Sequence, residues 1–218
     1  MDSIKTILGN SRPPTPGQKI YDDGEDEKTK EEKRVHRLAL RGVNDPSHTF
    51  DTMKRVKGFD HVLDAWEDLI RGKFQLLMIY GGVGNGKTRF CEAVVIEATD
   101  MGLFTRRDRW SDLVRAMKAH FNGRGDMSSY EEYFHGLRSR ETLIIDDIGS
   151  GSTLGSWEWG ELEDIIDYRY ERRLFTIVTT NLDIKAFPDR ILSRFRDKSR
   201  ARLVFNAAPD QRPLQVSR

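Results

Sequence analysis

The segment IYGGVGNGKTRF, residues 79–90, restricts the possible folds more than any other part of the sequence. It matches G-x-x-x-x-G-K-[ST], in which glycines let the backbone curl so that several N–H groups point at one anion. The apolar segment FQLLMIY precedes it, and the helix-forming segment KTRFCEAVVIEA follows it. We therefore expect a buried strand, an anion-binding loop and a helix whose N-terminus faces the anion.

The rest of the chain alternates apolar runs of strand length with segments of helical periodicity. This alternation predicts a parallel sheet covered on both faces, and such a sheet binds ligands at the carboxyl ends of its strands. We expect strands at residues 74–80, near Leu103, and at 142–146, 175–180 and 202–205. We expect helices at residues 31–40, 61–71, 87–101, 111–121, 130–137, 157–172 and 189–195.

Composition divides the chain into three parts. Residues 1–45 contain the pieces SRPPTPG and DDGEDEKTKEEKR, which offer few apolar residues to bury, so we expect a flexible charged arm with a possible short helix. About the first thirty residues are expected to be mostly disordered. Residues 46–206 carry the alternating pattern and form the core domain. Residues 207–218, AAPDQRPLQVSR, have no helical period and form a C-terminal tail.

Charge and cysteine content exclude several classes of protein. The formal net charge of the 218 residues is +1, so no global field favours nucleic acid or a membrane, and any basic surface is local. The single cysteine, Cys91, excludes an intramolecular disulfide and a multi-cysteine zinc site. No apolar run approaches membrane-spanning length and the N-terminus lacks a signal-peptide core. We therefore expect a cytoplasmic protein without membrane contact.

The glycine motif predicts a nucleoside triphosphate as the ligand. In this interpretation the loop amides hold the phosphates, Lys87 reaches the terminal phosphates as a point charge, and the Thr88 hydroxyl is a ligand of Mg²⁺. The alternative is a chance match in a glycine-rich turn, against which the flanking strand and helix argue. The expected nucleotide-binding residues are Gly81, Gly82, Val83, Gly84, Asn85, Gly86, Lys87, Thr88 and Arg89.

Two consecutive aspartates, Asp146 and Asp147, end the apolar segment TLII. A carboxylate at the end of a buried strand beside the phosphate-binding strand can hold the water shell of a metal, and its neighbour can polarise an attacking water. The alternative is a pair of aspartates that caps a turn between strand and loop. We assign Asp146 to Mg²⁺ and Asp147 to the water.

Polar and basic residues follow the later strands. The strand FTIVTT ends in Asn181, whose neutral amide can sense the γ-phosphate or position water without competing for the metal. The segment DRILSRFRDKSRAR is rich in arginine, and for most of these residues a solvated basic surface is the simpler interpretation. One arginine is expected to act as a finger that completes the ATP site of a neighbouring subunit.

The segments GGVGNGKT, LIIDDIG, IDYRYERRLFTIVTTNL and DRILSRFRD together resemble the AAA+ ATPases of the DnaC/IstB family, which are helicase loaders and transposition helpers. The resemblance covers roughly residues 45–206. It implies an α/β fold, a P-loop AAA+ three-layer sandwich with a five-stranded parallel sheet and little or no C-terminal helical lid. The strand that ends before Asn181, the sensor strand, would lie between the strand before the glycine loop and the strand before Asp146 and Asp147, the Walker B strand. It also implies functional roles for Lys87, Thr88, Asp146, Asp147 and Asn181, and an arginine finger at Arg194.

Three functions fit these motifs. The first is an ATP-switched loader that binds a replicative DNA helicase and single-stranded DNA, and the second is a transposition helper that coats duplex DNA and recruits a transposase. The third is a P-loop kinase or other nucleotide hydrolase. It is disfavoured because a sensor asparagine such as Asn181 and an arginine in an SRF segment such as Arg194 are features of proteins that assemble into oligomers. The resemblance implies ATP and Mg²⁺ as cofactors, an ATP-dependent homo-oligomer, and helicase contact through residues 1–45.

The segment FTRRDRWSDLVRAMKAHFNGR, residues 104–124, is a candidate surface for single-stranded DNA. Cationic side chains can follow a nucleic-acid backbone, and aromatic side chains can stack on unpaired bases. The alternative is an amphipathic helix that turns Leu113, Val114, Met117 and Phe121 toward the core. The sequence leaves both open. The basic residues are Arg106, Arg107, Arg109, Arg115, Lys118 and Arg124, and the aromatic ones are Phe104, Trp110 and Phe121.

Overall fold

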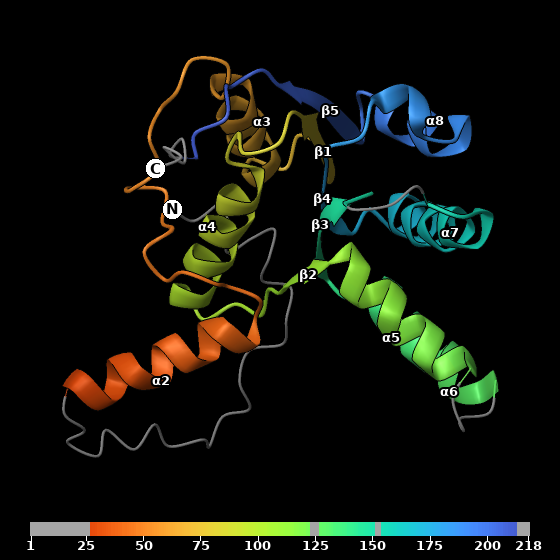
Figure 1. Ribbon diagram of the computed structural model, residues 1–218, viewed down its shortest axis with the longest axis horizontal. Coiled ribbons are helices and arrows are strands. Elements are labelled where there is room, and N and C mark those ends of the chain that lie inside the picture. The colour runs from red at the N-terminus through yellow and green to blue at the C-terminus, as the bar shows by residue number, and fades with distance from the viewer. Residues whose placement is uncertain (1–26, 123–126, 151–153, 213–218) are drawn as a thin grey trace, which may run out of the picture.

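The computed structural model describes residues 27–122, 127–150 and 154–212, and its centre is a sheet of five parallel strands (Figure 1). The order is β2-β3-β4-β1-β5, so β4 lies between the strand that precedes the glycine loop and the strand that carries the aspartates. This confirms the predicted sheet. The strands are β1 (Leu76–Gly81), β2 (Arg107–Arg109), β3 (Thr142–Ile148), β4 (Phe175–Thr180) and β5 (Ala201–Asn206).

Helices cover both faces of the sheet and give the predicted three layers (Figure 1). Successive side chains of β1 alternate between the faces: Leu77 and Ile79 join one core, and Leu76 and Met78 join the other. Burial on both faces explains the unbroken apolar run of this strand. One layer holds α3 (Asp60–Ile70) and α4 (Lys87–Asp100). The other holds α5 (Trp110–Asn122), α6 (Met127–Arg138), α7 (Ser156–Arg172) and α8 (Asp189–Arg196), with the short 3-10 helix η1 (Ile184–Ala186) between β4 and α8.

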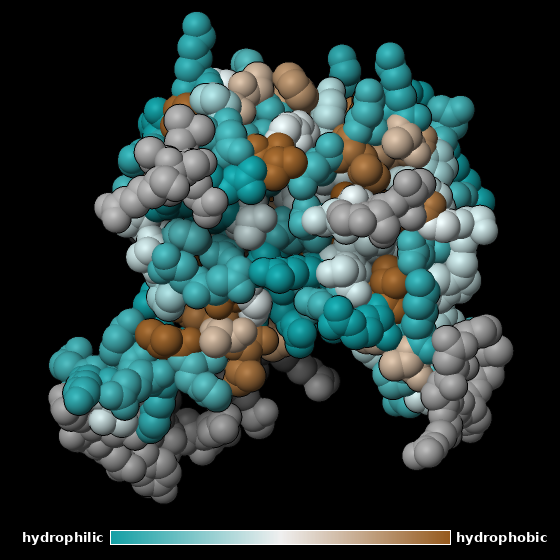
Figure 2. All heavy atoms as spheres, viewed as in Figure 1, coloured by the Kyte–Doolittle hydropathy of each residue, from teal (hydrophilic) through white to brown (hydrophobic). Residues whose placement is uncertain are grey.

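An additional helix, α2 (Glu27–Leu40), lies beside α4. Its Arg34 donates hydrogen bonds from Nε and Nη2 to the two carboxylate oxygens of Asp100, each 2.8 Å long. The helix begins four positions before the expected residue 31, so the prediction of disorder is wrong for residues 27–30 and lies outside the described residues for 1–26. Figure 2 shows hydrophobic side chains over α2, where Val35 and Leu40 are exposed.

The strand expected near Leu103 is instead β2, and the prediction of its position was wrong. Leu103 ends the turn after α4, where its N–H donates to the carbonyl oxygen of Ala98 at 2.8 Å. The strand itself has the sequence RDR, and its first two residues are buried because Arg107 pairs with Asp146 and Asp108 with Arg140. The other expected helices and strands are present, with their ends shifted by a few residues at most.

After β5 the described residues 207–212 form no helix, and we call this segment the C-terminal strap. The N–H of Ala207 donates to the carbonyl oxygen of Gly58 at 3.2 Å, and the N–H of Gln211 donates to that of Gly84 at 2.9 Å. The strap therefore crosses the glycine loop. Within the described part of the chain, none of the helices combines the length and the apolar character needed to cross a membrane.

Candidate nucleotide-binding site

The glycine loop connects the end of β1 to the start of α4 at the carboxyl edge of the sheet. Gly86 is the N-cap of α4 with a φ of 94°, a left-handed conformation that glycine adopts without strain. Gly84 also has a positive φ of 72°, and a Cβ atom there would lie 1.8 Å from Oδ1 of Asp210 in the strap. The backbone conformation therefore favours glycine at this position, and any larger residue would also have to displace the Asp210 side chain.

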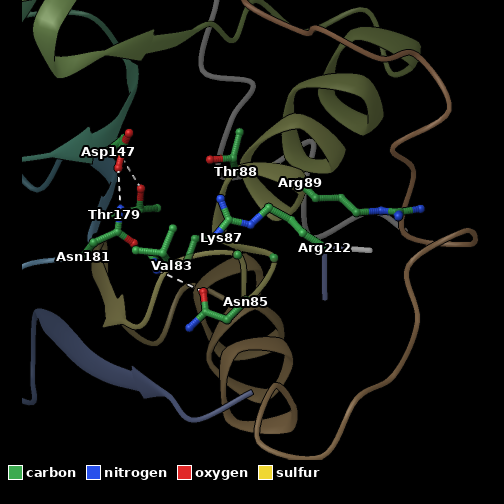
Figure 3. A pocket seen from close by; sticks show the side chains of 11 residues that line it. Val83, Asn85, Lys87, Thr88, Arg89, Asp147, Thr179, Asn181 and Arg212 are labelled. Carbon is green, nitrogen blue, oxygen red and sulfur yellow. Dashed lines mark hydrogen bonds between the residues drawn. The ribbon is translucent and has the colours of Figure 1, made fainter. Parts of the chain in front are cut away.

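A cavity of about 270 Å³ opens over this loop. Figure 3 shows Lys87 and Thr88, from the first turn of α4, beside Asp147 of β3 and Asn181, which follows β4. The free N–H groups at a helix N-terminus and its positive dipole end attract an anion to such a position. The cavity is lined by residues 83–89 and by Asp147, Thr179, Asn181 and Arg212.

Lys87 is folded onto its own loop. Its Nζ donates to the carbonyl oxygens of Gly81 at 2.9 Å and Gly82 at 2.7 Å, and to Oδ1 of Asn85 at 3.0 Å. Burial lowers the pKa of Lys87 to about 8, against the opposing effect of the Asp147 and Asp146 carboxylates. Gly81 and Gly82 do not line the cavity. They bind the lysine through their carbonyl groups instead.

The two consecutive aspartates have different surroundings because the strand is irregular where they lie. The register between β3 and β4 shifts between Ile145 and Ile148, and Asp147 has a φ of 64°. A positive φ is uncommon for a residue with a side chain, and such backbone strain is concentrated at functional sites. The bulge turns Asp147 into the cavity, whereas Asp146 is 1% exposed and does not line it.

Both carboxylates are oriented by hydrogen bonds. The Thr179 hydroxyl donates to Oδ1 of Asp146 at 2.5 Å and accepts the backbone N–H of Asp147 at 2.9 Å. Asn181 donates from Nδ2 to Oδ1 of Asp147 at 2.7 Å. The second oxygen of Asp146 accepts a hydrogen bond of 2.6 Å from Nη1 of Arg107. Thr179 and Asn181, at the carboxyl end of β4, thus fix the two aspartates of β3.

Sequence reasoning missed two residues of the cavity, Arg212 and Thr179. Arg212 lies in the strap, where Nη2 donates to Oδ2 of Asp210 at 2.6 Å. The signal available for Thr179 was its place two residues before Asn181 at the end of a buried strand. For Arg212 the sequence held no comparable signal, because its position depends on a strap that has neither helical nor strand periodicity.

Arg89 was expected to bind nucleotide, and it lines the cavity from the first turn of α4. Its Nη2 donates to the carbonyl oxygen of Thr52 at 2.8 Å and to the hydroxyl of the same residue at 3.1 Å. Its Nε is buried and has no hydrogen-bond partner among the described residues. Arg89 therefore joins α4 to the segment before α3.

Arg194 does not line the cavity with the other expected catalytic residues. It lies on α8, where Nε donates to Oδ1 of Asp167 on α7 at 2.8 Å and the guanidinium lies 5.0 Å from the centre of the Tyr170 ring. The hydrogen bond to Asp167 raises the pKa of Arg194. Within this subunit, the structure brings together Asp147 and Asn181 but not Arg194.

The expected DNA-binding segment is divided between surface and interior. Leu113, Val114 and Met117 are buried, as the amphipathic alternative predicts. Arg107 and Trp110 are buried too and face no solvent, so their assignment to a DNA surface is wrong. Phe104, Arg106, Arg109, Arg115 and Lys118 are exposed, with Arg106 paired to Asp108 and Lys118 to Glu158. Arg124 and the side chain of Phe121 lie outside the described residues.

The residues at the cavity fit a magnesium nucleotide. The Asp210 side chain of the strap lies against Gly84 of the loop, and the positive charges of Lys87, Arg89 and Arg212 line the same cavity. The Thr88 hydroxyl and the Asp147 carboxylate at the cavity are oxygen ligands of the kind that Mg²⁺ prefers, while the Asp146 carboxylate is buried outside the lining. A group that combines phosphates with this metal matches the donor set.

Comparison with known proteins gives a sequence relative. The chain is 26% identical over 196 residues to the chromosomal replication initiator protein DnaA of Chlorobaculum tepidum. The aligned region covers 84% of this chain and 37% of that protein. The chain spans about a third of the length of the curated relatives it matches. No protein-family model matches the sequence.

Solved structures show the same fold. The replication initiator DnaA bound to AMPPCP and single-stranded DNA is 24% identical, with a TM-score of 0.58 over 74% of this chain and 50% of that chain. The DnaC helicase loader is 19% identical, with a TM-score of 0.61 over 73% of this chain and 96% of that chain. The expected likeness to DnaC thus holds for the fold, and the likeness in sequence extends to DnaA. The protein has the α/β fold of a AAA+ P-loop ATPase domain.

Proposed function

We propose that the protein binds and hydrolyses ATP with Mg²⁺ and acts as a DNA replication helicase loader. The observation that carries this proposal is the meeting of four predicted residues at one cavity: Lys87 and Thr88 from α4, Asp147 from β3 and Asn181 after β4. Charge, metal ligand, base and polar sensor are the parts that phosphoryl transfer to water requires.

Each side chain has a role that follows from its position. Lys87 leaves the carbonyl oxygens of Gly81 and Gly82 and neutralises the terminal phosphates, since a phosphate is a stronger partner than a carbonyl. Thr88 and Asp146 hold Mg²⁺, which neutralises charge on the β- and γ-phosphates when bound. Asp147, fixed by Asn181, orients the attacking water and accepts its proton.

Two arginines complete the site from different subunits. Arg212 lines the cavity of its own chain and can contact the nucleotide from the strap. Arg194 lies away from this cavity on α8, so it acts only where a neighbouring copy brings its α8 to the site. This separation supports the proposal of an ATP-dependent homo-oligomer in which Arg194 is the arginine finger.

The loader role is supported by the match to the DnaC helicase loader, which extends over nearly the whole of that chain. The exposed apolar residues of α2 give the arm formed by residues 27–45 a surface for a replicative helicase. The exposed residues Phe104, Arg106, Arg109, Arg115 and Lys118 are the remaining candidates for contact with single-stranded DNA, which a structurally similar DnaA binds.

The test compares the ATP-bound and ADP-bound protein. Purified replicative helicase from the same organism should bind the full chain with affinity that depends on the nucleotide, and so should a single-stranded oligonucleotide. A transposase that binds in place of the helicase would support the alternative, an IstB-like transposition helper. ATP hydrolysis with neither partner would leave a nucleotide hydrolase of another role and remove the loader proposal.

A further inference from the structure

A buried ion network joins the candidate metal carboxylate to the neighbouring helix. Arg107 of β2 is 4% exposed, and its guanidinium contacts two carboxylates. Nη1 lies 2.6 Å from Oδ2 of Asp146, and Nη2 lies 3.3 Å from Oε1 of Glu92 on α4. Glu92, like Asp146, is 1% exposed. Because water screens such buried charges little, the guanidinium attracts both acids strongly.

The same network holds the segment that precedes the core domain, which we call the linker (residues 41–48). Nε of Arg107 donates to the carbonyl oxygen of Gly42 at 2.7 Å. Oε1 of Glu92 accepts hydrogen bonds from the backbone N–H of Asn44 at 3.1 Å and from its side-chain amide at 2.6 Å. Oε2 of Glu92 lies 2.6 Å from Nδ1 of His48. The linker follows α2 directly, so the arginine connects Asp146 to the segment that carries this helix.

Both oxygens of Asp146 are occupied. Oδ1 accepts the Thr179 hydroxyl, and Oδ2 accepts Arg107. Each oxygen keeps a second lone pair, so a metal ion or its bound water would approach Asp146 beside one of these two donors. The Thr179 hydroxyl is neutral, whereas Arg107 is a cation that a divalent metal repels. The contact with Arg107 is therefore the one that magnesium weakens.

We propose that Arg107 is a positioning residue that couples magnesium–nucleotide occupancy at Asp146 to the linker and α2. Without metal, Arg107 neutralises Asp146 and keeps its affinity for a free cation low. When magnesium arrives with the nucleotide, the guanidinium shifts toward Glu92, where it competes with Asn44 and His48. The contacts of the linker then loosen, and α2 becomes free to move relative to α4. This inference rests on the proposed nucleotide site.

Hydrogen exchange in the unmodified full chain provides the first test. The Asn44 amide is protected by Glu92, and the Arg107 amide donates to the carbonyl oxygen of Arg41 at 2.9 Å. Mg-AMPPCP should raise the exchange rates of residues 42–48 by about tenfold, a change of about 1.4 kcal/mol in opening free energy. AMPPCP with EDTA should leave them unchanged. Equal exchange in the two conditions would overturn the coupling.

Binding of Mn²⁺ to the nucleotide-free protein, measured by electron paramagnetic resonance, provides the second test. The double variant Arg107→Met/Glu92→Gln removes one charge of each sign, so the net charge of the network is unchanged and Asp146 remains as its one buried acid. It should bind Mn²⁺ about tenfold more tightly than the parent, and addition of Asp146→Asn should abolish the gain. The Mn²⁺ affinity of Arg107→Lys, which keeps the charge but loses the two-pronged guanidinium, should lie between those of the parent and the double variant.

A control separates metal binding from the attachment of α2. Arg34→Met breaks the pair with Asp100 at the C-terminal end of α4, so it should raise hydrogen exchange in α2 while Mn²⁺ affinity stays at the parent value. Parent-like Mn²⁺ affinity in the Arg107→Met/Glu92→Gln variant would overturn the role of Arg107. If that variant does not fold, exchange in the unmodified chain decides alone. Failure of the unmodified chain to bind Mg-AMPPCP would remove the proposed function as well, whereas tight binding with an unchanged linker removes this inference alone.

Discussion

Asn181 donates a hydrogen bond of 2.7 Å to the carboxylate of Asp147 and so joins the residue that follows β4 to the bulge of its neighbour β3. The amide fixes one oxygen of the acid and leaves the other for a water. Since Asp147 is held in a left-handed backbone conformation, its side chain is oriented by both the main chain and a neighbour. An acid fixed in this way requires little rearrangement to act as a base.

Asp147→Asn should keep ATP binding and lose turnover, because an amide fills the same space but accepts no proton. We expect hydrolysis to fall by about 10² to 10⁴, the usual contribution of a general base. Calorimetry measures the affinity and phosphate release measures the rate. Asn181→Ala, which keeps the carboxylate without its partner, should give a smaller loss. Hydrolysis by Asp147→Asn at the parent rate would place the base elsewhere.

Lys87→Ala should weaken Mg-ATP binding by about 10-fold or more, since a hydrogen bond to a charged group contributes about 1.5 to 3 kcal/mol. The pKa of this lysine in the free protein is about 8, below its ordinary value, so the charge is present below that pH and is lost as the pH rises through it. ATP affinity of the parent should therefore fall between about pH 7 and pH 9.

Calorimetry in buffers with different heats of ionisation checks this dependence. Near pH 8 the parent should take up a fraction of a proton when ATP binds, because phosphate stabilises the charged lysine. The Lys87→Ala variant should show less uptake. Identical proton uptake in the two proteins would assign the linkage to another group.

Arg212→Ala should weaken binding of ATP by about 10-fold or more, because this guanidinium lines the cavity from within the same chain. ADP should be affected less if the arginine contacts the terminal phosphate. Arg196→Ala, an exposed residue of α8, is a matched control and should bind both nucleotides like the parent. Equal losses for ATP and ADP would place Arg212 at another part of the nucleotide.

Arg194→Ala should leave nucleotide binding nearly unchanged and reduce assembly-dependent hydrolysis, in which arginine fingers contribute about 10³ to 10⁵ in rate. Mixing decides whether the arginine acts across subunits. Arg194→Ala subunits retain their own cavity, and Asp147→Asn subunits can still donate the arginine. The mixture should exceed the sum of its parts. Purely additive activity that does not rise with protein concentration would indicate a site complete within one chain.

Arg169→Met should destabilise the fold by about 3 kcal/mol or more, because it leaves several buried acceptors without a donor. Arg169 is 0% exposed and donates to the carbonyl oxygens of Arg138 at 2.9 Å, Arg140 at 2.7 Å and Phe175 at 2.6 Å. Denaturant unfolding measures the loss. Arg172→Met, an exposed position of the same helix, should change stability little.

The sheet and the phosphate loop could be predicted because their residues obey local rules. The segment LLMIYG is apolar throughout since both faces of β1 are covered, and the glycines mark the turn that follows. The strand β2 violates these rules. Arg107 and Asp108 are buried there through ion pairs with residues that are distant in the sequence, so no local pattern could indicate a strand.

The site shows the same division. Asp147 and Asn181 were predictable as polar residues at the ends of apolar strands. The bulge in β3, which sends Asp146 into the interior and Asp147 into the cavity, could not be predicted, because strand alternation alone does not specify a bulge. Arg212 was missed because its position is fixed by main-chain contacts of the strap with Gly58 and Gly84.

The hydrogen bond from Gln211 to Gly84 has a practical consequence for work with this protein. A fluorophore attached at Gln211 would sit beside the phosphate loop and would report nucleotide exchange directly. Since the lone native cysteine, Cys91, is buried, a maleimide dye would label an introduced Gln211→Cys selectively. By the same geometry, a bulky fusion partner joined shortly after Arg212 would crowd the cavity that Arg212 lines, so purification handles are better placed at the other end of the chain.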